Sequence, residues 1–308
     1  MWFKNAGAGQ SEREHQSHPR THVRYKTASR PLKKFFGKFN LDVISPGLVE
    51  WFKVARSADV SPASVNRDMA VFRYMMNFAI RQGYLLGNPV SGVRFLDEGP
   101  GIMRVVSHEE EQKYLKAASM LLRDFATVIL ETGMRPGEVF TIRKENVHLS
   151  KQYLFVPIGK TKYARRNVPL TEGVVELLKR RLAEAEGPYL FPHRHDPNKP
   201  LTTLKKAHEE ALRKAEIKTR FRIYDLRHTF GSRTAMAGVD LATLKELMGH
   251  SQISMTMRYV HPTPEHKRQA VNKLEQFNVE QVFALYENRE GVPTKAPTVA
   301  NQQQNQVF

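Results

Sequence analysis

The sequence predicts a mainly helical α+β protein with two domains, and three observations support this prediction. Apolar residues recur at steps of three and four along most of the chain, which is typical of helices with one buried face. Only the short segments 153–158 and 164–170 have the character of strands. A stretch that contains glycine and proline interrupts the pattern near residue 100, and a chain of 308 residues is long enough for two domains.

We expect the first domain at residues 21–98 and expect it to be entirely helical, opening with a basic helix. Ser45 is a candidate N-cap for the second helix, with Pro46 at its first position. Ser61 can cap the third helix, which is the clearest in the chain. Its apolar stripe consists of Val65, Met69, Phe72, Met76 and Ala79. Residues 1–20 are polar and are expected to be disordered.

We expect the second domain at residues 107–277, after a linker at 99–106. It begins with the pattern of a capping box, formed by Ser107 and Glu110, ahead of two helices. The second of these helices is apolar enough to be buried. The two predicted strands follow, joined by the basic turn "GKTKY", and Thr171 can cap the helix after them.

The rest of the second domain is expected to be helical. The predicted helices cover residues 202–215, 225–237, 240–248 and a short segment that contains Tyr259. Gly238 and Gly249 stand at helix ends, where glycine is common. Residues 264–289 are expected to form one or two further helices. A C-terminal tail at 278–308 is expected to be partly disordered, because its last part is rich in Pro, Gln and Asn.

The composition favours a nucleic-acid partner. Lys and Arg number 48 against 31 Asp and Glu, a net charge of +17, and nucleic acid is the commonest polyanion that attracts such a protein. A merely basic, soluble surface is the alternative. The absence of cysteine excludes disulfides, thiolate zinc sites and a cysteine nucleophile, and it is consistent with a cytoplasmic location. The sequence shows neither a membrane span nor a secretory leader, so no membrane partner is expected.

Two arginines stand where helices are expected to begin. Arg135 precedes Pro136 in "ETGMRPGEVF", and Glu138 could hold its guanidinium in place. A helix N-terminus also attracts anions, although a structural Arg–Glu pair is the simpler interpretation. Arg227 lies in the first turn of a helix that Asp225 can cap. A solvent-facing arginine is the alternative at this second position.

Three further candidates come from a histidine, a hairpin and a tyrosine. His228 follows Arg227 and is expected to be a packed helix histidine rather than a ligand or a base. The hairpin tip "GKTKYARR" is basic, and its opening "GK" singles out Lys160 as a residue that could reach a phosphate. In "MGHSQISMTMRYVHP", His250 and Tyr259 are nine residues apart, so Tyr259 is either a core aromatic or a nucleophile above an anion.

Taken in order, these motifs resemble the tyrosine recombinase (phage integrase) family. The resemblance rests on "TGMRPGE", the hairpin lysine, "YDLRHTF", "LMGHS" and the tyrosine that follows, and it covers about residues 20–275. It implies a helical, SAM-like core-binding domain followed by a tyrosine-recombinase catalytic domain. It also implies a DNA strand-breaking and rejoining enzyme for DNA integration or excision, which binds double-stranded recombination sites and assembles on them as a tetramer.

The resemblance implies a role for each candidate residue. Arg135 and Arg227 would bind the non-bridging oxygens of one DNA phosphate, and His250 would be a third donor. Lys160 would protonate the leaving 5′ oxygen, and Tyr259 would be the nucleophile that forms a 3′-phosphotyrosine bond. This chemistry requires no cofactor and no metal ion, and no Asp/Glu cluster in the sequence resembles a two-metal nuclease site. The cationic surroundings are expected to favour the Tyr259 phenolate.

One position departs from the family pattern. The family usually has a histidine three residues before the second arginine, and here that residue is Tyr224. A tyrosine can donate a hydrogen bond to a phosphate oxygen, but with a pKa of about 10 it cannot act as an imidazole base at neutral pH. Two alternatives therefore stay open, a catalytically weakened DNA-binding relative and a type IB topoisomerase-like enzyme without strand exchange.

Overall fold

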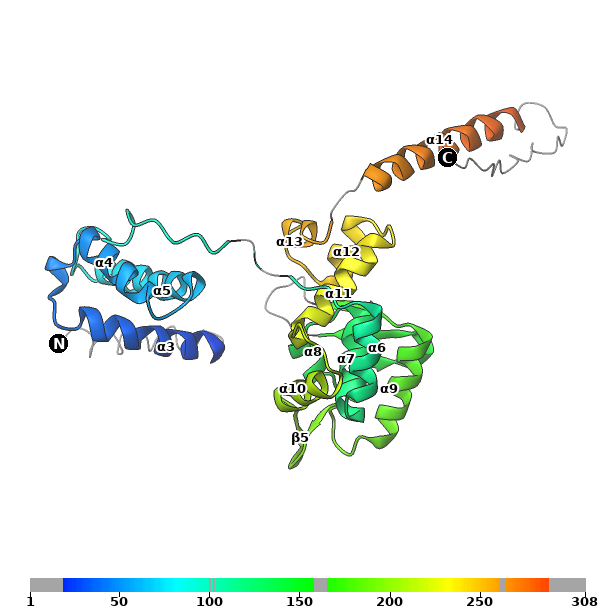
Figure 1. The fold of residues 1–308 in the computed structure, drawn as a ribbon, viewed down its shortest axis with the longest axis horizontal. Coiled ribbons are helices and arrows are strands. Elements are labelled where there is room, and N and C mark those ends of the chain that lie inside the picture. The colour runs from blue at the N-terminus through cyan, green and yellow to red at the C-terminus, as the bar shows by residue number, and fades with distance from the viewer. Residues whose placement is uncertain (1–18, 100, 102, 158–164, 261–263, 288–308) are drawn as a thin grey trace. The chain divides into compact units, whose positions relative to one another are not determined.

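The protein is described by a computed structural model that covers residues 19–99, 101, 103–157, 165–260 and 264–287 (Figure 1). The chain divides into two compact units, residues 1–102 and 103–308. Helices dominate both units, and the described strands belong to the second. The mainly helical α+β class that the sequence predicts is therefore confirmed.

Unit 1 is helical throughout its described part. Its elements are α3 (Pro19–Phe36), the 3-10 turn η1 (Leu41–Val43), α4 (Pro46–Ser57) and α5 (Pro62–Arg81). Phe36 stacks on Phe72 with 4.3 Å between ring centroids, at the centre of an apolar core. Asp68 is buried on α5 and accepts hydrogen bonds from Arg24 and Arg56, so one carboxylate ties three helices together.

The two predicted caps of unit 1 have different outcomes. The Ser45 hydroxyl accepts a hydrogen bond from the backbone N–H of Leu48, as the sequence predicts. Ser61 occupies the N-cap position of α5, but its side chain caps no backbone group. Its hydroxyl instead lies 3.2 Å from that of Ser64, so the prediction of a side-chain cap is wrong there.

Unit 2 holds the larger core. Its α-helices are α6 (His108–Ala117), α7 (Met120–Thr132), α8 (Pro136–Phe140), α9 (Glu172–Glu184), α10 (Lys205–Lys214), α11 (Ile223–Met236), α12 (Leu241–Met248), α13 (Ser254–Met257) and α14 (Pro264–Glu287). Two 3-10 turns, η2 (Lys144–Asn146) and η3 (Leu149–Lys151), flank the first strand. Helix α7 packs along α11, and Phe125, Ile129 and Leu226 are fully buried in the core that they share (Figure 1).

Two small antiparallel sheets border this core. The first has the order β1 (Val147–His148), β2 (Tyr153–Val156), β3 (Arg166–Pro169), and the second pairs β4 (Pro192–His193) with β5 (Asp196–Pro200). Leu154 faces Val168 across the first sheet, and both side chains are buried. The predicted strand pair is therefore present, although each strand is shorter than expected. The sequence missed β1 and the second sheet, which it assigned to a loop.

Helix ends in unit 2 follow the sequence at two positions and depart from it at two others. The capping box of Ser107 and Glu110 is formed, and the Thr171 hydroxyl caps α9. Asp225 is not an N-cap, because α11 begins earlier and the Asp225 carboxylate accepts from the backbone N–H of Arg222. Tyr259 lies just beyond α13 rather than inside a helix.

The segment after residue 263 forms one helix, α14, of 24 residues. It extends into the tail that the sequence placed at 278–308, so the first part of that tail is helical through Glu287. Within the described residues, no helix combines the length and the apolar character that a membrane crossing needs.

Candidate active site

Arg227 is the centre of the candidate site. It lies one turn after the start of α11, and its side chain is fully buried. Its Nη1 donates to the carbonyl oxygen of Gly133 at 2.5 Å, and its Nη2 donates to that of Met248 at 2.6 Å. Both carbonyls stand at helix C-terminal ends, where the backbone dipoles favour a cation.

The buried guanidinium of Arg227 is poised for an anion. Burial, followed by repulsion from Arg135, lowers the pKa of Arg227 to about 10, so it still carries its proton at neutral pH. Its Nε has no hydrogen-bond partner within the part of the chain that the structure describes. A buried cation with a spare donor gains energy when an anion supplies the missing acceptor.

Arg135 is fixed by its own helix start. It is the N-cap of α8, and Pro136 fixes the first helical position after it. Its backbone N–H and its Nη1 both donate to the Glu138 carboxylate, at 2.9 and 2.8 Å. Its Nη2 donates to the carbonyl oxygen of Gly249 at 2.9 Å. The supporting role predicted for Glu138 is consistent with these contacts.

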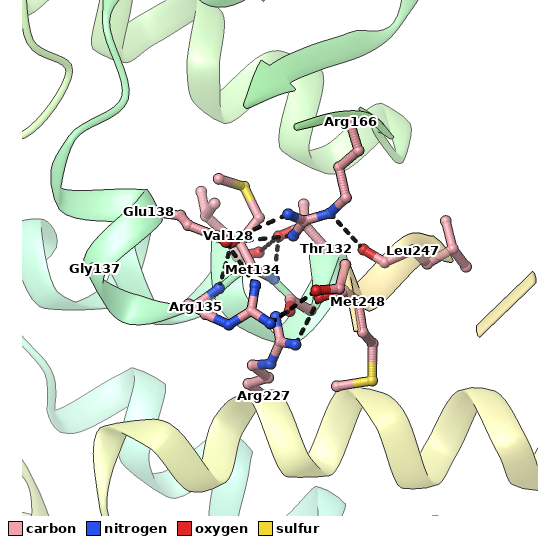
Figure 2. Close-up of polar contacts among 12 residues, drawn as sticks. Val128, Thr132, Met134, Arg135, Gly137, Glu138, Arg166, Arg227, Leu247 and Met248 are labelled. Carbon is pink, nitrogen blue, oxygen red and sulfur yellow. Dashed lines mark hydrogen bonds and ion pairs between the residues drawn. The ribbon is translucent and has the colours of Figure 1, made fainter. Parts of the chain in front are cut away.

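Arg166, at the start of β3, completes the cluster in Figure 2. Its Nη2 donates to Glu138 at 3.0 Å and its Nε donates to the carbonyl oxygen of Leu247 at 2.9 Å. Burial alone would raise the pKa of Glu138, but the hydrogen bonds and charges of Arg166 and Arg135 outweigh it and lower that pKa. The sequence placed Arg166 on a basic hairpin and missed this role.

Three consecutive carbonyl groups at the C-terminal end of α12 hold the three arginines. Leu247 accepts from Arg166, Met248 from Arg227, and Gly249 from Arg135. Because one helix end anchors all three guanidinium groups, Arg135 and Arg227 are brought to the same place from α8 and α11.

Gly249 makes this arrangement possible. Its φ of +62° is in the left-handed region that ends α12, and a Cβ atom there would lie 2.8 Å from Nη1 of Arg166. The chain then turns directly into His250, whose backbone N–H donates to the carbonyl oxygen of Lys245 at 3.0 Å. Gly249 therefore fixes the position of His250 and also leaves room for the side chain of Arg166.

His250 is a neutral, fixed ring. It is buried, and its Nδ1 lies 2.9 Å from the Thr256 hydroxyl. Burial, followed by the charges of Arg227 and Arg135, lowers the pKa of His250 to about 3. The ring therefore has a single N–H at neutral pH. When Nδ1 accepts from Thr256, that N–H is on Nε2 and is available to an anion.

Tyr259 packs beside these groups with its ring buried. The ring lies parallel to that of His250, with 6.1 Å between centroids and 6° between planes. Its hydroxyl oxygen is 2.9 Å from Nδ1 of His228. A Cβ at Gly231 would lie 2.9 Å from the Tyr259 ring, so this glycine makes space for it. Tyr259 is therefore a packed aromatic, as one of the two interpretations predicts, and its role as a nucleophile stays a prediction.

Burial and the nearby charges act on the Tyr259 phenol in opposite directions. The charge of Arg227 favours the phenolate, in the direction that the sequence predicts, but burial outweighs it and raises the pKa of the phenol. Tyr259 therefore keeps its proton at neutral pH in this structure.

One candidate residue, Tyr224, lies at the edge of this cluster. Tyr224 is 41% exposed on the first turn of α11, and its ring centroid is 5.1 Å from that of His228. It lines a cavity of about 430 Å³ together with Lys205 and Arg222. Lys160 lies outside the described residues. The structure thus gathers Arg135, Arg227, His250 and Tyr259 with Glu138, and it leaves Tyr224 at the edge.

The fold is that of a tyrosine recombinase. The chain aligns with the Tn1549 transposon integrase, solved with transposon right end DNA, at a TM-score of 0.75 and 18% identity, covering 89% of this chain and 99% of that one. A lambda integrase dimer bound to a COC′ core site aligns at a TM-score of 0.69 and 15% identity, covering 81% and 95% of the two chains.

The sequence comparison establishes the family. The profile of the phage integrase family matches residues 101–266, more than half of the chain, and the protein belongs to this family. It is 28% identical to the integrase of Escherichia phage P2 over 219 residues, which is 70% of this chain and 60% of that integrase. It is 26% identical to a tyrosine recombinase of Thermosipho africanus over 274 residues, covering 81% and 91% of the two chains.

Proposed function

We propose that this protein is a site-specific DNA recombinase that cleaves and rejoins DNA through a 3′-phosphotyrosyl intermediate. The observation that carries the proposal is the set of three consecutive carbonyls at the end of α12, which holds Arg135 and Arg227 together. The next residue, His250, lies parallel to the ring of Tyr259. Membership of the phage integrase family supports the same reaction class.

The arginines and the histidine bind the phosphate that is attacked. Each guanidinium donates in its own plane to non-bridging oxygens, where negative charge develops in the transition state. Nε of Arg227 and the single N–H of His250 supply further donors. Each fixed donor of this kind typically contributes about 10²- to 10³-fold in rate.

Cleavage exchanges one phosphodiester bond for another. The Tyr259 oxygen forms a bond to phosphorus while the bond from phosphorus to the 5′ oxygen breaks. Lys160 is the residue proposed to give its proton to that leaving oxygen. The products are a 3′-phosphotyrosine bond and a free 5′-hydroxyl. A 5′-hydroxyl from another duplex then attacks the phosphotyrosine and reseals the strand. Because the bond energy is retained, the scheme uses neither ATP nor a metal ion.

The partners of the reaction follow from the same scheme. Strand exchange needs two duplexes, each cut on both strands, and therefore four protomers. A lambda integrase tetramer has been solved on a Holliday junction, and it aligns with this chain at a TM-score of 0.68. We extend tetrameric assembly on double-stranded recombination sites to this protein as part of the proposal. Its net charge of +17 favours the DNA partner.

A nicked suicide duplex tests the proposal. The protein's own site is first selected by binding from a pool of random-sequence duplexes, and a nick near the cleavage point then lets the short 5′-hydroxyl product diffuse away. We expect a covalent protein–DNA adduct on a denaturing gel with the wild type and none with Tyr259→Phe, which loses only the phenolic oxygen. A wild type that binds but forms no adduct would identify the weakened DNA-binding relative, and adduct formation without exchange between two sites would identify the topoisomerase-like alternative.

A further inference from the structure

His228 contacts the nucleophile that the proposed function assigns. The sequence favours a packed helix histidine at this position, one residue after Arg227 on α11. The ring is buried, but its Nδ1 lies 2.9 Å from the hydroxyl oxygen of Tyr259. The two ring centroids are 5.8 Å apart with 44° between planes. This hydrogen bond joins a titratable side chain directly to the reacting oxygen.

Burial, helped by nearby positive charges, keeps the ring of His228 neutral. Burial is the main effect that lowers its pKa, and the positive charges of Arg258, Arg222 and Arg227 lower it further. Asp225, on the same helix, opposes them. At neutral pH one ring nitrogen therefore has a lone pair. In the tautomer with the proton on Nε2, that nitrogen is Nδ1, which accepts the Tyr259 O–H.

The site also needs a proton acceptor. Tyr259 keeps its proton, because burial raises its pKa, so attack on phosphorus requires a group that takes that proton. Tyr224 occupies the position where the family usually has a histidine, and a phenol is no base at neutral pH. Its ring packs edge-on against His228 at 5.1 Å, so the base that this position lacks is available one helical turn further on.

We propose that His228 is the general base of strand cleavage, a role that rests on the proposed function. As the Tyr259 oxygen bonds to phosphorus, its O–H bond breaks and the proton passes to Nδ1 of His228. The 5′ oxygen leaves with a proton from the separate general acid. When a 5′-hydroxyl reseals the strand, its proton returns to the general acid and the imidazolium gives its own proton to the departing Tyr259 oxygen, so every group regains its starting state.

Two substitutions separate proton transfer from positioning. Asn at position 228 keeps an acceptor oxygen near the place of Nδ1 but cannot take a proton, whereas Ala removes both. Single-turnover adduct formation on the nicked duplex is measured from pH 6 to 9. We expect His228→Asn and His228→Ala to be slowed alike at pH 7, by about 10²-fold or more, which is the usual contribution of a general base.

The pH profile gives the second readout. The wild-type rate should reach a plateau above the lowered pKa of His228. The variants depend on phenolate formed by hydroxide, so their rates should rise about tenfold per pH unit and the deficit should shrink towards high pH. A deficit that stays constant with pH, or wild-type cleavage by His228→Asn, overturns the assignment and leaves His228 as a positioning residue.

A second histidine–tyrosine pair provides the matched control. His208 is buried and its Nδ1 lies 2.7 Å from the Tyr114 hydroxyl, without contact to the candidate nucleophile. His208→Asn should keep the wild-type pH profile. Thermal unfolding and binding to an intact site verify folding of each variant. The ¹⁵N resonances of His228 report its tautomer directly in the wild-type protein, without any substitution. A protonated Nδ1 at pH 7 to 8 overturns the proposal. If the wild-type protein itself forms no covalent adduct with DNA, the proposed function is refuted instead.

Discussion

At the scale of single residues, the site is organised around a cation, Arg227, for which the described residues supply no carboxylate hydrogen-bond partner. Arg227 is fully buried, and two backbone carbonyls accept its described hydrogen bonds. Burying a charge in this way costs stability, and carbonyl dipoles at helix ends only partly offset the cost. A DNA phosphate would supply the missing negative charge. The arrangement therefore favours binding of an anion over stability of the free protein.

For the rate of DNA cleavage, the several N–H donors of the planar Arg227 guanidinium are expected to contribute more than its positive charge alone. Lysine at this position keeps the charge but cannot reach both carbonyls and the phosphate at once. We expect Arg227→Lys to lower the rate of adduct formation by about 10²-fold or more, in line with loss of a fixed oxyanion donor. Arg180→Lys, at an ion pair with Asp124 away from the site, serves as the control. Near-normal cleavage by Arg227→Lys would remove this residue from the site.

Three buried histidines make stability depend on pH. Burial is the main cause that lowers the pKa values of His208, His228 and His250, the last to about 3. Below about pH 6.5 the unfolded chain binds protons at these residues more readily than the folded protein does, so acid favours unfolding. The free energy of unfolding should therefore fall between pH 7.5 and 5, by up to roughly 1.4 kcal/mol per histidine and pH unit below pH 6.5.

Urea unfolding of the DNA-free protein at the two pH values measures this effect. His250→Asn removes one of the three groups and should reduce the pH dependence even if its stability at pH 7.5 is lower. A free energy of unfolding that is equal at pH 5 and 7.5 would show that these histidines are protonated in the folded protein.

At the scale of elements, helix starts were predictable and short strands were not. Three helix starts could be predicted from their capping residues, Ser45, Ser107 and Thr171. A side-chain cap joins residues within four positions of each other, so the sequence pattern alone reveals it. Strands β1 and β4 have two residues each, too few for an alternating pattern to be detected. They form because the surrounding core brings the backbones together.

The same contrast applies to the site. Glu138 was predictable because its partner Arg135 is three residues away. Arg166 was not, since its partners Glu138 and Leu247 are 28 and 81 residues away in the chain. The contact between His228 and Tyr259 spans 31 residues and was missed for the same reason. Contacts within a few residues can thus be predicted from sequence motifs, whereas contacts between distant segments are decided by tertiary packing.

The end of α12 offers a direct test of this element. Gly249→Ala adds a Cβ atom 2.8 Å from Nη1 of Arg166 at a φ of +62°, which disfavours other residues. We expect a loss of roughly 1 kcal/mol or more in unfolding free energy. We also expect slower adduct formation, because three arginines and His250 depend on this turn. At Gly173 in α9, an added Cβ has no neighbour within 4 Å, so Gly173→Ala should leave both quantities near the wild type. Equal behaviour of the two variants would contradict the role given to Gly249.

At the scale of the whole molecule, helix α14 differs from the other helices of unit 2. Large apolar side chains along it are more than half exposed, and they are Val271, Leu274, Phe277, Val282 and Phe283. An exposed apolar surface of this kind on a protein usually marks a contact with a partner. Because α14 begins five residues after Tyr259, a partner bound to this helix would affect the position of the proposed nucleophile.

Removal of α14 tests whether that partner is another protomer. If α14 docks on a neighbour in the assembled complex, a chain that ends at residue 263 should unfold at the wild-type temperature and bind a single site normally. It should lose cooperative binding of paired sites and most recombination, because assembly would no longer place Tyr259.

Substitution of Leu274 and Phe277 by Ser in the full chain should reproduce this pattern, since these exposed side chains supply the apolar surface. Lys273→Ser, a polar change at the position just before Leu274, is the matched control. If α14 packs on its own domain instead, truncation should lower the unfolding temperature and weaken single-site binding. A truncated protein that is stable, cooperative and fully recombining would refute both roles.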